Sequence, residues 1–188
     1  MRWKSTQAAL LTMAAVAFEF QGCHVGPVPS VPDLSGTYIS HAAIIHADQK
    51  TVDEIMAAYK RAEEAVQRRD LSGVMAFYSE NYQHRGLRKV EIKRFWSDLF
   101  ERYHDFSSTH VLTRITSHTD TTPPKSDVAC TGSVWAIANQ TNQRENIDSW
   151  FDEVHNLVYE NGAWRIRGNA WEGTPRAGSV GAPPHAFF

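Results

Sequence analysis

Tyrosine, histidine and acidic side chains are the residues of this chain whose types could do chemistry together. A neutral histidine near a carboxylate can act as a general base, and a tyrosine hydroxyl can stabilise an enolate-like oxygen. Such a set would serve a dehydratase, an isomerase or a cyclase without a cofactor, and we expect no cofactor. The candidate catalytic residues are Tyr78, His84, Glu153 and His155.

Each of these candidates also has a purely structural explanation. Tyr78 lies on the apolar stripe of its predicted helix, as a packed core residue would. His84 could equally be a surface residue or one held by a hydrogen bond. His155 could equally be a strand residue whose ring nitrogens are hydrogen-bonded for structural reasons. Glu153 fits a cross-strand ion pair. The residue types therefore favour a protein without catalysis over an enzyme.

Other kinds of site have less support. The nine histidines are dispersed and the chain has no HExxH or CxxC pattern, so we expect no metal site. No glycine-rich loop precedes a helix, and no GxSxG elbow is present. Cys130 lies in an apolar run and is expected to be a buried, inert thiol.

The charge balance indicates no polyanionic partner. The formal net charge is −2 at pH 7, so we expect no binding of nucleic acid. A locally basic region is interleaved with acidic residues and fits a solvated helix face. Its residues are Arg68, Arg69, Arg85, Arg88, Lys89, Lys93 and Arg94.

The N-terminus has the features of an export signal. Arg2 and Lys4 supply a positive region, and residues 8–18 form an apolar stretch too short to span a bilayer. Cys23 follows a glycine, which resembles the site at which bacterial lipoproteins are cleaved and acylated. We expect a signal peptide over 1–22 and a lipid anchor at Cys23. The protein would then lie in the cell envelope, on the periplasmic face if there are two membranes. Simple secretion and an uncleaved anchor are the alternatives.

Segments of low complexity flank one expected domain. Residues 23–50 comprise the lipidated cysteine and a linker rich in proline and glycine at its start, and within it residues 38–45 fit either a short strand or a helix. Glycine, proline and alanine dominate residues 173–188, which we expect to be a disordered tail. The domain itself is expected over 51–172, which is long enough to bury a core.

Three amphipathic helices are indicated by apolar residues at a period of 3.6. The first starts at Thr51, which forms a capping box with Glu54. Asp70 is expected to cap a short second helix. The third helix spans residues 90–103 and has a wide apolar stripe.

From residue 107 the apolar period changes to two, which predicts strands. These strands span residues 107–118, 126–138, 145–160 and 163–171. The last two are joined at Asn161-Gly162, a pair that favours a tight hairpin turn. An α+β fold follows, with three N-terminal helices packed on a curved antiparallel sheet of four to five strands.

This order of elements resembles the nuclear transport factor 2-like superfamily, and within it the SnoaL-like proteins. The resemblance rests on residues 65–71, 75–82 and 160–166, and it covers the chain from about 51 to 171. It implies a cystatin-like α+β cone with a pocket between the concave sheet and the helices. The superfamily includes ketosteroid isomerase, scytalone dehydratase, ligand binders and scaffolds, so the fold leaves the function open.

The hairpin turn also predicts which strand residues face the pocket of such a cone. The expected cross-strand pairs are Tyr159–Trp164, Leu157–Ile166 and His155–Gly168. By alternation, Phe151, Glu153 and His155 share the inward face. The residues expected to bind a ligand are Tyr59, Tyr78, Tyr82, His84, Trp96, His155 and Trp164.

The same alternation places Trp150 and Trp171 on the outer face of the sheet. Two tryptophans on an outer face predict a homodimer surface. A bulge anywhere between Asp148 and Glu153 would reverse the faces upstream of it, because a one-residue slip inverts every side chain.

Three interpretations of the function follow. The first is an exported, lipid-anchored cone domain that binds a small apolar ligand or a protein partner without catalysis. The second is a cofactor-independent lyase, isomerase or cyclase that uses the Tyr/His/acid set. The third is a dimeric scaffold whose cavity is filled by its own side chains.

Overall fold

The computed structural model describes residues 35–84 and 86–168. All described residues belong to one compact unit. The predicted signal peptide, Cys23, Trp171 and the predicted tail lie outside the described residues.

A five-stranded sheet forms one layer of the described fold, with strand order β1-β4-β5-β6-β7. Its strands are β1 (Gly36–His46), β4 (Tyr103–His118), β5 (Lys125–Ala138), β6 (Arg144–Glu160) and β7 (Ala163–Ile166). The ladders from β4 to β7 are antiparallel, whereas β1 runs parallel to β4. The predicted α+β class is confirmed, and the sheet is mixed at its β1 edge rather than antiparallel throughout.

Strand β1 occupies a segment that the sequence assigned to the linker. Residues 38–45, which fitted a strand or a helix, lie within this strand. It pairs with β4 from Gly36–Thr109 to His46–Thr116, with one irregularity between Ile39 and Ile44. The folded part therefore begins before residue 51, because β1 satisfies backbone groups of β4 that would otherwise form an open edge.

Three helices are described, α1 (Gln49–Gln67), α2 (Leu71–Met75) and α3 (Lys89–Arg102). The α1 cap is Asp48, whose carboxylate accepts hydrogen bonds from the Thr51 backbone nitrogen and hydroxyl, both at 2.9 Å. The predicted start at Thr51 is therefore two residues late. Asp70 caps α2 as predicted, accepting from the Gly73 nitrogen at 3.0 Å.

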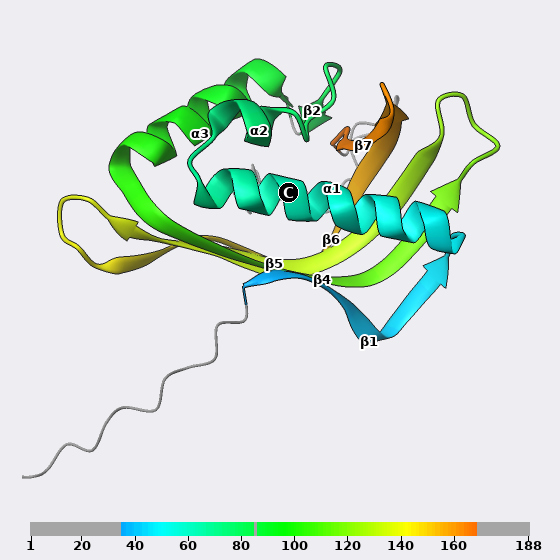
Figure 1. The fold of residues 1–188 in the computed structure, drawn as a ribbon, viewed down its shortest axis with the longest axis horizontal. Coiled ribbons are helices and arrows are strands. Elements are labelled where there is room, and N and C mark those ends of the chain that lie inside the picture. The colour runs from blue at the N-terminus through cyan, green and yellow to red at the C-terminus, as the bar shows by residue number, and fades with distance from the viewer. Residues whose placement is uncertain (1–34, 85, 169–188) are drawn as a thin grey trace, which may run out of the picture. The chain divides into compact units, whose positions relative to one another are not determined.

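Helix α1 lies across the concave side of the curved sheet, with α2 and α3 beyond it at one end (Figure 1). A short hairpin of β2 (Gln83–His84) and β3 (Leu87–Arg88) precedes α3. The core forms where the apolar faces of the helices meet the sheet. Its larger side chains include Ile55, Tyr59, Tyr78, Ile92, Trp96, Leu112, Ile115, Leu157 and Trp164.

The closing hairpin has the predicted geometry at its turn. Asn161 and Gly162 have φ values of 52° and 78°, the positive region that a two-residue hairpin needs. The predicted pairs Tyr159–Trp164 and Leu157–Ile166 are confirmed. The ladder ends at the second of these pairs, before the predicted His155–Gly168 pair.

A bulge in β6 reverses the predicted faces upstream of Glu153. Cys130 pairs with Glu153 and Gly132 with Trp150, so β6 has one residue more than β5 between these pairs. Asp152 has a φ of 48° at this point, and its backbone nitrogen donates to Thr131 Oγ1 at 3.0 Å. The strand therefore resumes with the opposite alternation.

The reversal moves two aromatic side chains to the faces opposite those predicted. Trp150 is only 7% exposed and joins the core, whereas Phe151 is 86% exposed. Gly132 makes room for Trp150, since a Cβ at Gly132 would lie 2.5 Å from the indole atom Cζ2. The predicted outward Trp150 and inward Phe151 are both wrong, and the expected dimer surface loses Trp150.

Candidate functional site

Two regions of the described fold could hold a functional site, namely the interior of the cone and a groove between α2 and α3. In the interior, Tyr59 of α1 and His155 of β6 form a hydrogen bond between Oη and Nδ1 at 3.0 Å. Both side chains are buried. The structure thus joins two predicted site residues that are 96 positions apart in the chain.

A second polar group in the interior was not identified from the sequence. His110 of β4 donates from Nδ1 to Glu63 Oε1 at 2.8 Å, and the Thr37 hydroxyl of β1 donates to the same oxygen at 2.8 Å. The group ties α1 to both strands. One signal was available, because Glu63 lies among the apolar residues of the first helix, where a carboxylate needs buried partners.

Aromatic rings fill the space around these hydrogen bonds. The His110 ring lies 5.6 Å from Tyr59 and 5.2 Å from Trp150, measured between centroids. Trp150 Nε1 donates to Cys130 Sγ at 3.4 Å. The interior is therefore a packed aromatic and polar cluster.

Three other predicted ligand-binding residues, Tyr78, Trp96 and Trp164, also form hydrogen bonds within the fold. Trp96 Nε1 donates to Tyr78 Oη at 3.2 Å, and Trp164 Nε1 donates to Glu54 Oε2 at 3.2 Å. Tyr59, Tyr78 and Trp96 are each at most 1% exposed, so other atoms cover them almost completely. These contacts are those of core residues.

The predicted catalytic residues contact different partners. His84 Nε2 and Glu153 Oε1 lie 4.0 Å apart, which is close enough for an ion pair but too long for a hydrogen bond. His155 is bonded to Tyr59, and Tyr78 accepts from Trp96. The four residues therefore do not form one cluster of contacts: His84 and Glu153 lie near each other, whereas His155 and Tyr78 each take part in a separate hydrogen bond of the core.

Burial keeps the interior phenols and the thiol protonated. It raises the pKa values of Tyr59 and Tyr78 well above 10.0, and together with the charge of Glu153 it raises the pKa of Tyr82. Burial also raises the pKa of the Cys130 thiol to about 12. Neutral hydroxyls can donate hydrogen bonds, but they supply neither a base nor a nucleophile at neutral pH. Cys130 is therefore buried and unreactive in character.

The groove between α2 and α3 is open, unlike the cone. Its volume is about 750 Å³, within the range of about 300–1,000 Å³ typical of small-molecule pockets. Leu71 and Met75 of α2 and Val90 of α3 give it an apolar lining, in which Val90 is 46% exposed and Met75 is 7% exposed. Ser72, Glu80, Arg88, Lys89 and Lys93 complete the lining.

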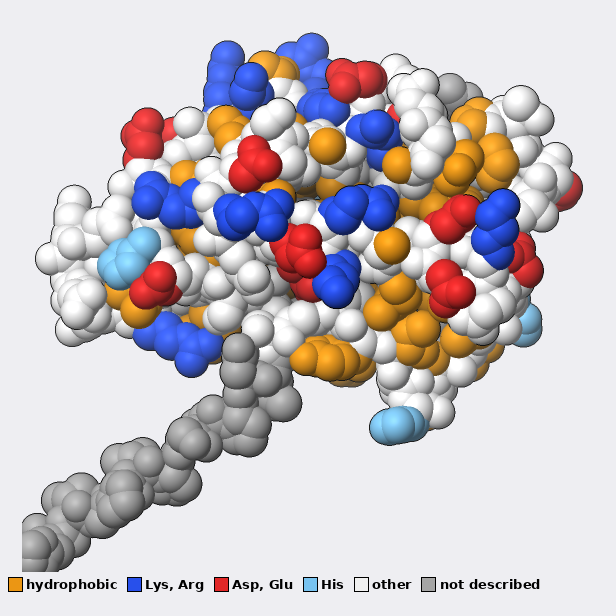
Figure 2. Space-filling model, in the orientation of Figure 1, with side chains coloured by type: hydrophobic (Ala, Val, Ile, Leu, Met, Phe, Trp, Pro, Cys, Tyr) orange, Lys and Arg blue, Asp and Glu red, His pale blue; other side chains and the backbone are white. Residues whose placement is uncertain are grey.

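Positive charge surrounds this apolar lining. Figure 2 shows Lys and Arg side chains gathered over α2 and α3. Lys89 donates to Glu80 Oε1 at 2.7 Å and to the Tyr78 carbonyl at 2.8 Å, while Arg88 pairs with Glu91 at 3.2 Å. Of the predicted basic region, Arg88, Lys89 and Lys93 line the groove, and Arg85 lies outside the described residues.

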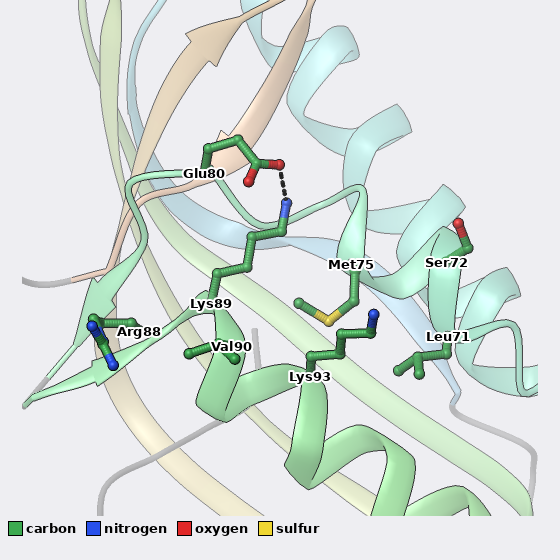
Figure 3. Close-up of a pocket in the computed structure, with 8 residues that line it drawn as sticks. All are labelled: Leu71, Ser72, Met75, Glu80, Arg88, Lys89, Val90 and Lys93. Carbon is green, nitrogen blue, oxygen red and sulfur yellow. Dashed lines mark hydrogen bonds and ion pairs between the residues drawn. The ribbon is translucent and has the colours of Figure 1, made fainter.

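Figure 3 shows the arrangement of these side chains. Met75 lies between Lys89 and Lys93, and Lys93 extends from α3 toward Leu71 of α2. The Lys89 hydrogen bond holds the pKa of the Glu80 carboxyl below its usual value, so this carboxyl stays ionised and compensates Lys89. The groove therefore offers apolar side chains beside the positively charged ammonium groups of Lys89 and Lys93.

A second, smaller hollow of about 560 Å³ lies between β1 and α1. Its lining includes Tyr38, Met56, Lys60, Glu63 and Glu64. Glu63 is already bonded to Thr37 and His110, so the hollow reaches a carboxylate that the fold itself uses.

Two further findings concern metal ions and membranes. Within residues 35–84 and 86–168, no three His, Cys, Asp or Glu side chains lie close enough to hold a metal ion. In the same residues, no helix is both long and apolar enough to cross a membrane.

Comparison with known proteins gives matches to solved structures. No protein-family model matches the chain, and no curated protein is significantly similar to it. A conserved protein from Planctomyces limnophilus matches with a TM-score of 0.53 and 10% identity, over 64% of this chain and 94% of its own. The protein Aln2 from a Streptomyces species matches with a TM-score of 0.50 and 16% identity, over 65% of this chain and 90% of its own. A ketosteroid isomerase-like protein from Erwinia carotovora atroseptica matches with a TM-score of 0.49 and 16% identity, over 64% of this chain and 94% of its own.

Matches at such low identity show a shared fold and nothing about activity. The matches to the Planctomyces limnophilus protein and to Aln2 show that this chain shares their fold, and the predicted α+β fold is confirmed. The candidate sites must therefore be judged on the residues of this chain.

Proposed function

We propose that this cone-fold protein is a non-catalytic binding protein of the cell envelope, and that it holds a small apolar molecule in the groove between α2 and α3. One contrast carries the proposal. The interior residues that would contact a ligand in a hollow cone are at most 1% exposed at Tyr59, Tyr78 and Trp96. In the groove, Val90 is 46% exposed and Leu71 is partly exposed, whereas Met75 is 7% exposed.

The groove has the composition of a binding site rather than of a surface irregularity. Apolar side chains from two helices converge on it, and polar groups stand at its margins. Burying a methylene group there stabilises a complex by up to about 0.8 kcal/mol. A short alkyl chain could therefore bind measurably without entering the cone.

The groove can be tested with decan-1-ol and the full chain labelled with 13C at the methionine methyl groups. Met75 lines the groove and Met56 lines the second hollow, so one spectrum reports on both places. We expect decan-1-ol to shift the Met75 methyl signal and to leave the Met56 signal in place.

Matched variants separate the groove from general surface adhesion. Val90→Asp places a charge in the apolar lining and should weaken binding of decan-1-ol about tenfold. Ile44→Asp changes an exposed apolar residue of β1 and should leave binding unchanged. Equal binding by the wild type and Val90→Asp would overturn the proposed site.

The envelope location is part of the proposal and rests on the sequence. Arg2 and Lys4, the apolar residues 8–18 and the following Cys23 support it. Mass spectrometry of the protein from membranes should find a diacylglyceryl group on Cys23. The Cys23→Ser variant should leave the membrane fraction, and unchanged fractionation would contradict the anchor.

Catalysis in the cone is the second candidate, and the Tyr59–His155 hydrogen bond favours it. A substrate would have to displace packed side chains, because both residues are buried. The same titration tests this alternative when the histidine ring nitrogens are labelled with 15N. If decan-1-ol shifted His155 rather than Met75, the site would lie in the cone.

A further inference from the structure

The charges that line the groove are unequally compensated. Lys89 is paired with Glu80, and Arg88 is paired with Glu91. Lys93 extends across the groove and makes no hydrogen bond or ion pair with any described residue (Figure 3). One positive charge therefore faces the apolar lining without a partner among the described residues.

This arrangement selects the head group of a ligand. A chain lying against Val90 and Met75 would bring its polar end to Lys93, which Figure 3 shows between these residues and Leu71. An ammonium head would be repelled, and a doubly charged phosphate would keep one charge uncompensated. A carboxylate carries the single negative charge that matches one free ammonium group.

We infer that the groove binds a free, single-chain fatty carboxylate, with its alkyl chain between α2 and α3 and its carboxylate at Lys93. This inference rests on the proposed function, since it needs the groove to be a binding site. Ser72 adds a hydroxyl at the margin that can donate to the same head group. The apolar lining sets the affinity, and Lys93 sets the preference for an anion.

The experiment titrates the methionine-labelled full chain with decanoate, decylammonium and decan-1-ol below their aggregation concentrations. We expect decanoate to shift Met75 and to bind about tenfold tighter than decylammonium. Octanoate should bind more weakly than decanoate, by about twofold per methylene for a half-buried chain. Added salt should weaken the binding of decanoate and leave the binding of decan-1-ol unaffected.

A charge reversal isolates the role of Lys93. Lys93→Glu should weaken the binding of decanoate about tenfold. It should leave the affinity for decan-1-ol within about twofold of the wild-type value. Lys93→Arg should retain decanoate binding. Lys60→Glu on α1 is the matched control and should change neither ligand, because Lys60 lines the other hollow.

The outcomes distinguish the two proposals. Suppose that decan-1-ol binds at Met75, but decylammonium binds as tightly as decanoate, or Lys93→Glu leaves the affinity for decanoate unchanged. The carboxylate inference then fails and the apolar site stands. If none of the three ligands shifts Met75, both proposals fail. If decanoate binds only when presented in anionic vesicles, the surface recognises a membrane and the inference of a free ligand is overturned.

Discussion

The cone interior and the α2–α3 groove are both lined by apolar and ionisable side chains, yet they use them in different ways. In the interior, each acid and histidine described above faces a partner from another element, as Glu63 does with His110 and Thr37. In the groove, the charges sit at the margin of an apolar lining in which Val90 and Leu71 remain accessible to solvent.

This difference shows that polar residues inside a cone need not mark an active site. A buried carboxylate or histidine requires hydrogen-bond partners for stability alone. The exposed lysine beside partly exposed apolar side chains is the less expected feature, because no contact within the described fold requires it there. The functional hypothesis accordingly moves from the cone to the groove.

The largest effect should come from the bulge in β6. Trp150→Ala should lower the free energy of unfolding by about 3–5 kcal/mol, because it empties part of the core. Phe151→Ala should change it by less than about 0.5 kcal/mol, because that side chain is 86% exposed. Urea denaturation measures both values, and similar losses in the two variants would contradict the bulge.

Next in size is the polar group that ties α1 to the sheet. Glu63→Ala should cost about 3 kcal/mol in unfolding free energy, since Thr37 and His110 lose their common acceptor inside the core. Glu64→Ala removes a more exposed neighbouring carboxylate and should cost less than about 0.5 kcal/mol. An equally small effect at Glu63 would mean that the interior is not packed as described.

The Cys130 thiol should make a smaller, pH-dependent contribution. Unfolded, it loses its proton above its ordinary pKa of 9.0, whereas burial keeps it protonated in the fold up to a pKa of about 12. Between these values the folded state binds more protons, so stability should fall as pH rises, by at most about 1.4 kcal/mol per pH unit.

The difference between the wild type and Cys130→Ala isolates that contribution, since all other groups titrate in both proteins. In a Cys23→Ser background, Cys130 should react with a thiol reagent at pH 8 only as fast as the protein opens. Rapid reaction in the native state would show that the interior is accessible.

The smallest effect should occur in the groove. Val90→Ala and Lys93→Gln should each change the free energy of unfolding by less than about 0.5 kcal/mol, because both side chains are solvent-facing. Ile92→Ala on the same helix should cost about 2–5 kcal/mol, since Ile92 is fully buried. A cost at Val90 as large as that at Ile92 would place the groove within the core.

Local patterns accounted for most of the secondary structure. The third helix was expected over 90–103 and spans Lys89–Arg102, and the Asn161-Gly162 turn predicted the pairing of β6 with β7. The cap of the first helix was missed, because Asp48 lies just outside the apolar period from which the helix start at Thr51 was predicted. Strand β1 was left undecided, since its role depends on a partner about 70 positions away.

The sequence by itself determined the fold class, the helix periods and the final hairpin, because these depend on neighbours within a few residues of one another. Tertiary structure alone decided the faces of β6 upstream of the bulge, where Gly132 and the backbone at Asp152 turn Trp150 inward. It also decided which polar residues meet. Tyr59 and His155, or Lys93 and Met75, become neighbours only when packing brings separate elements together, and no local period encodes that contact.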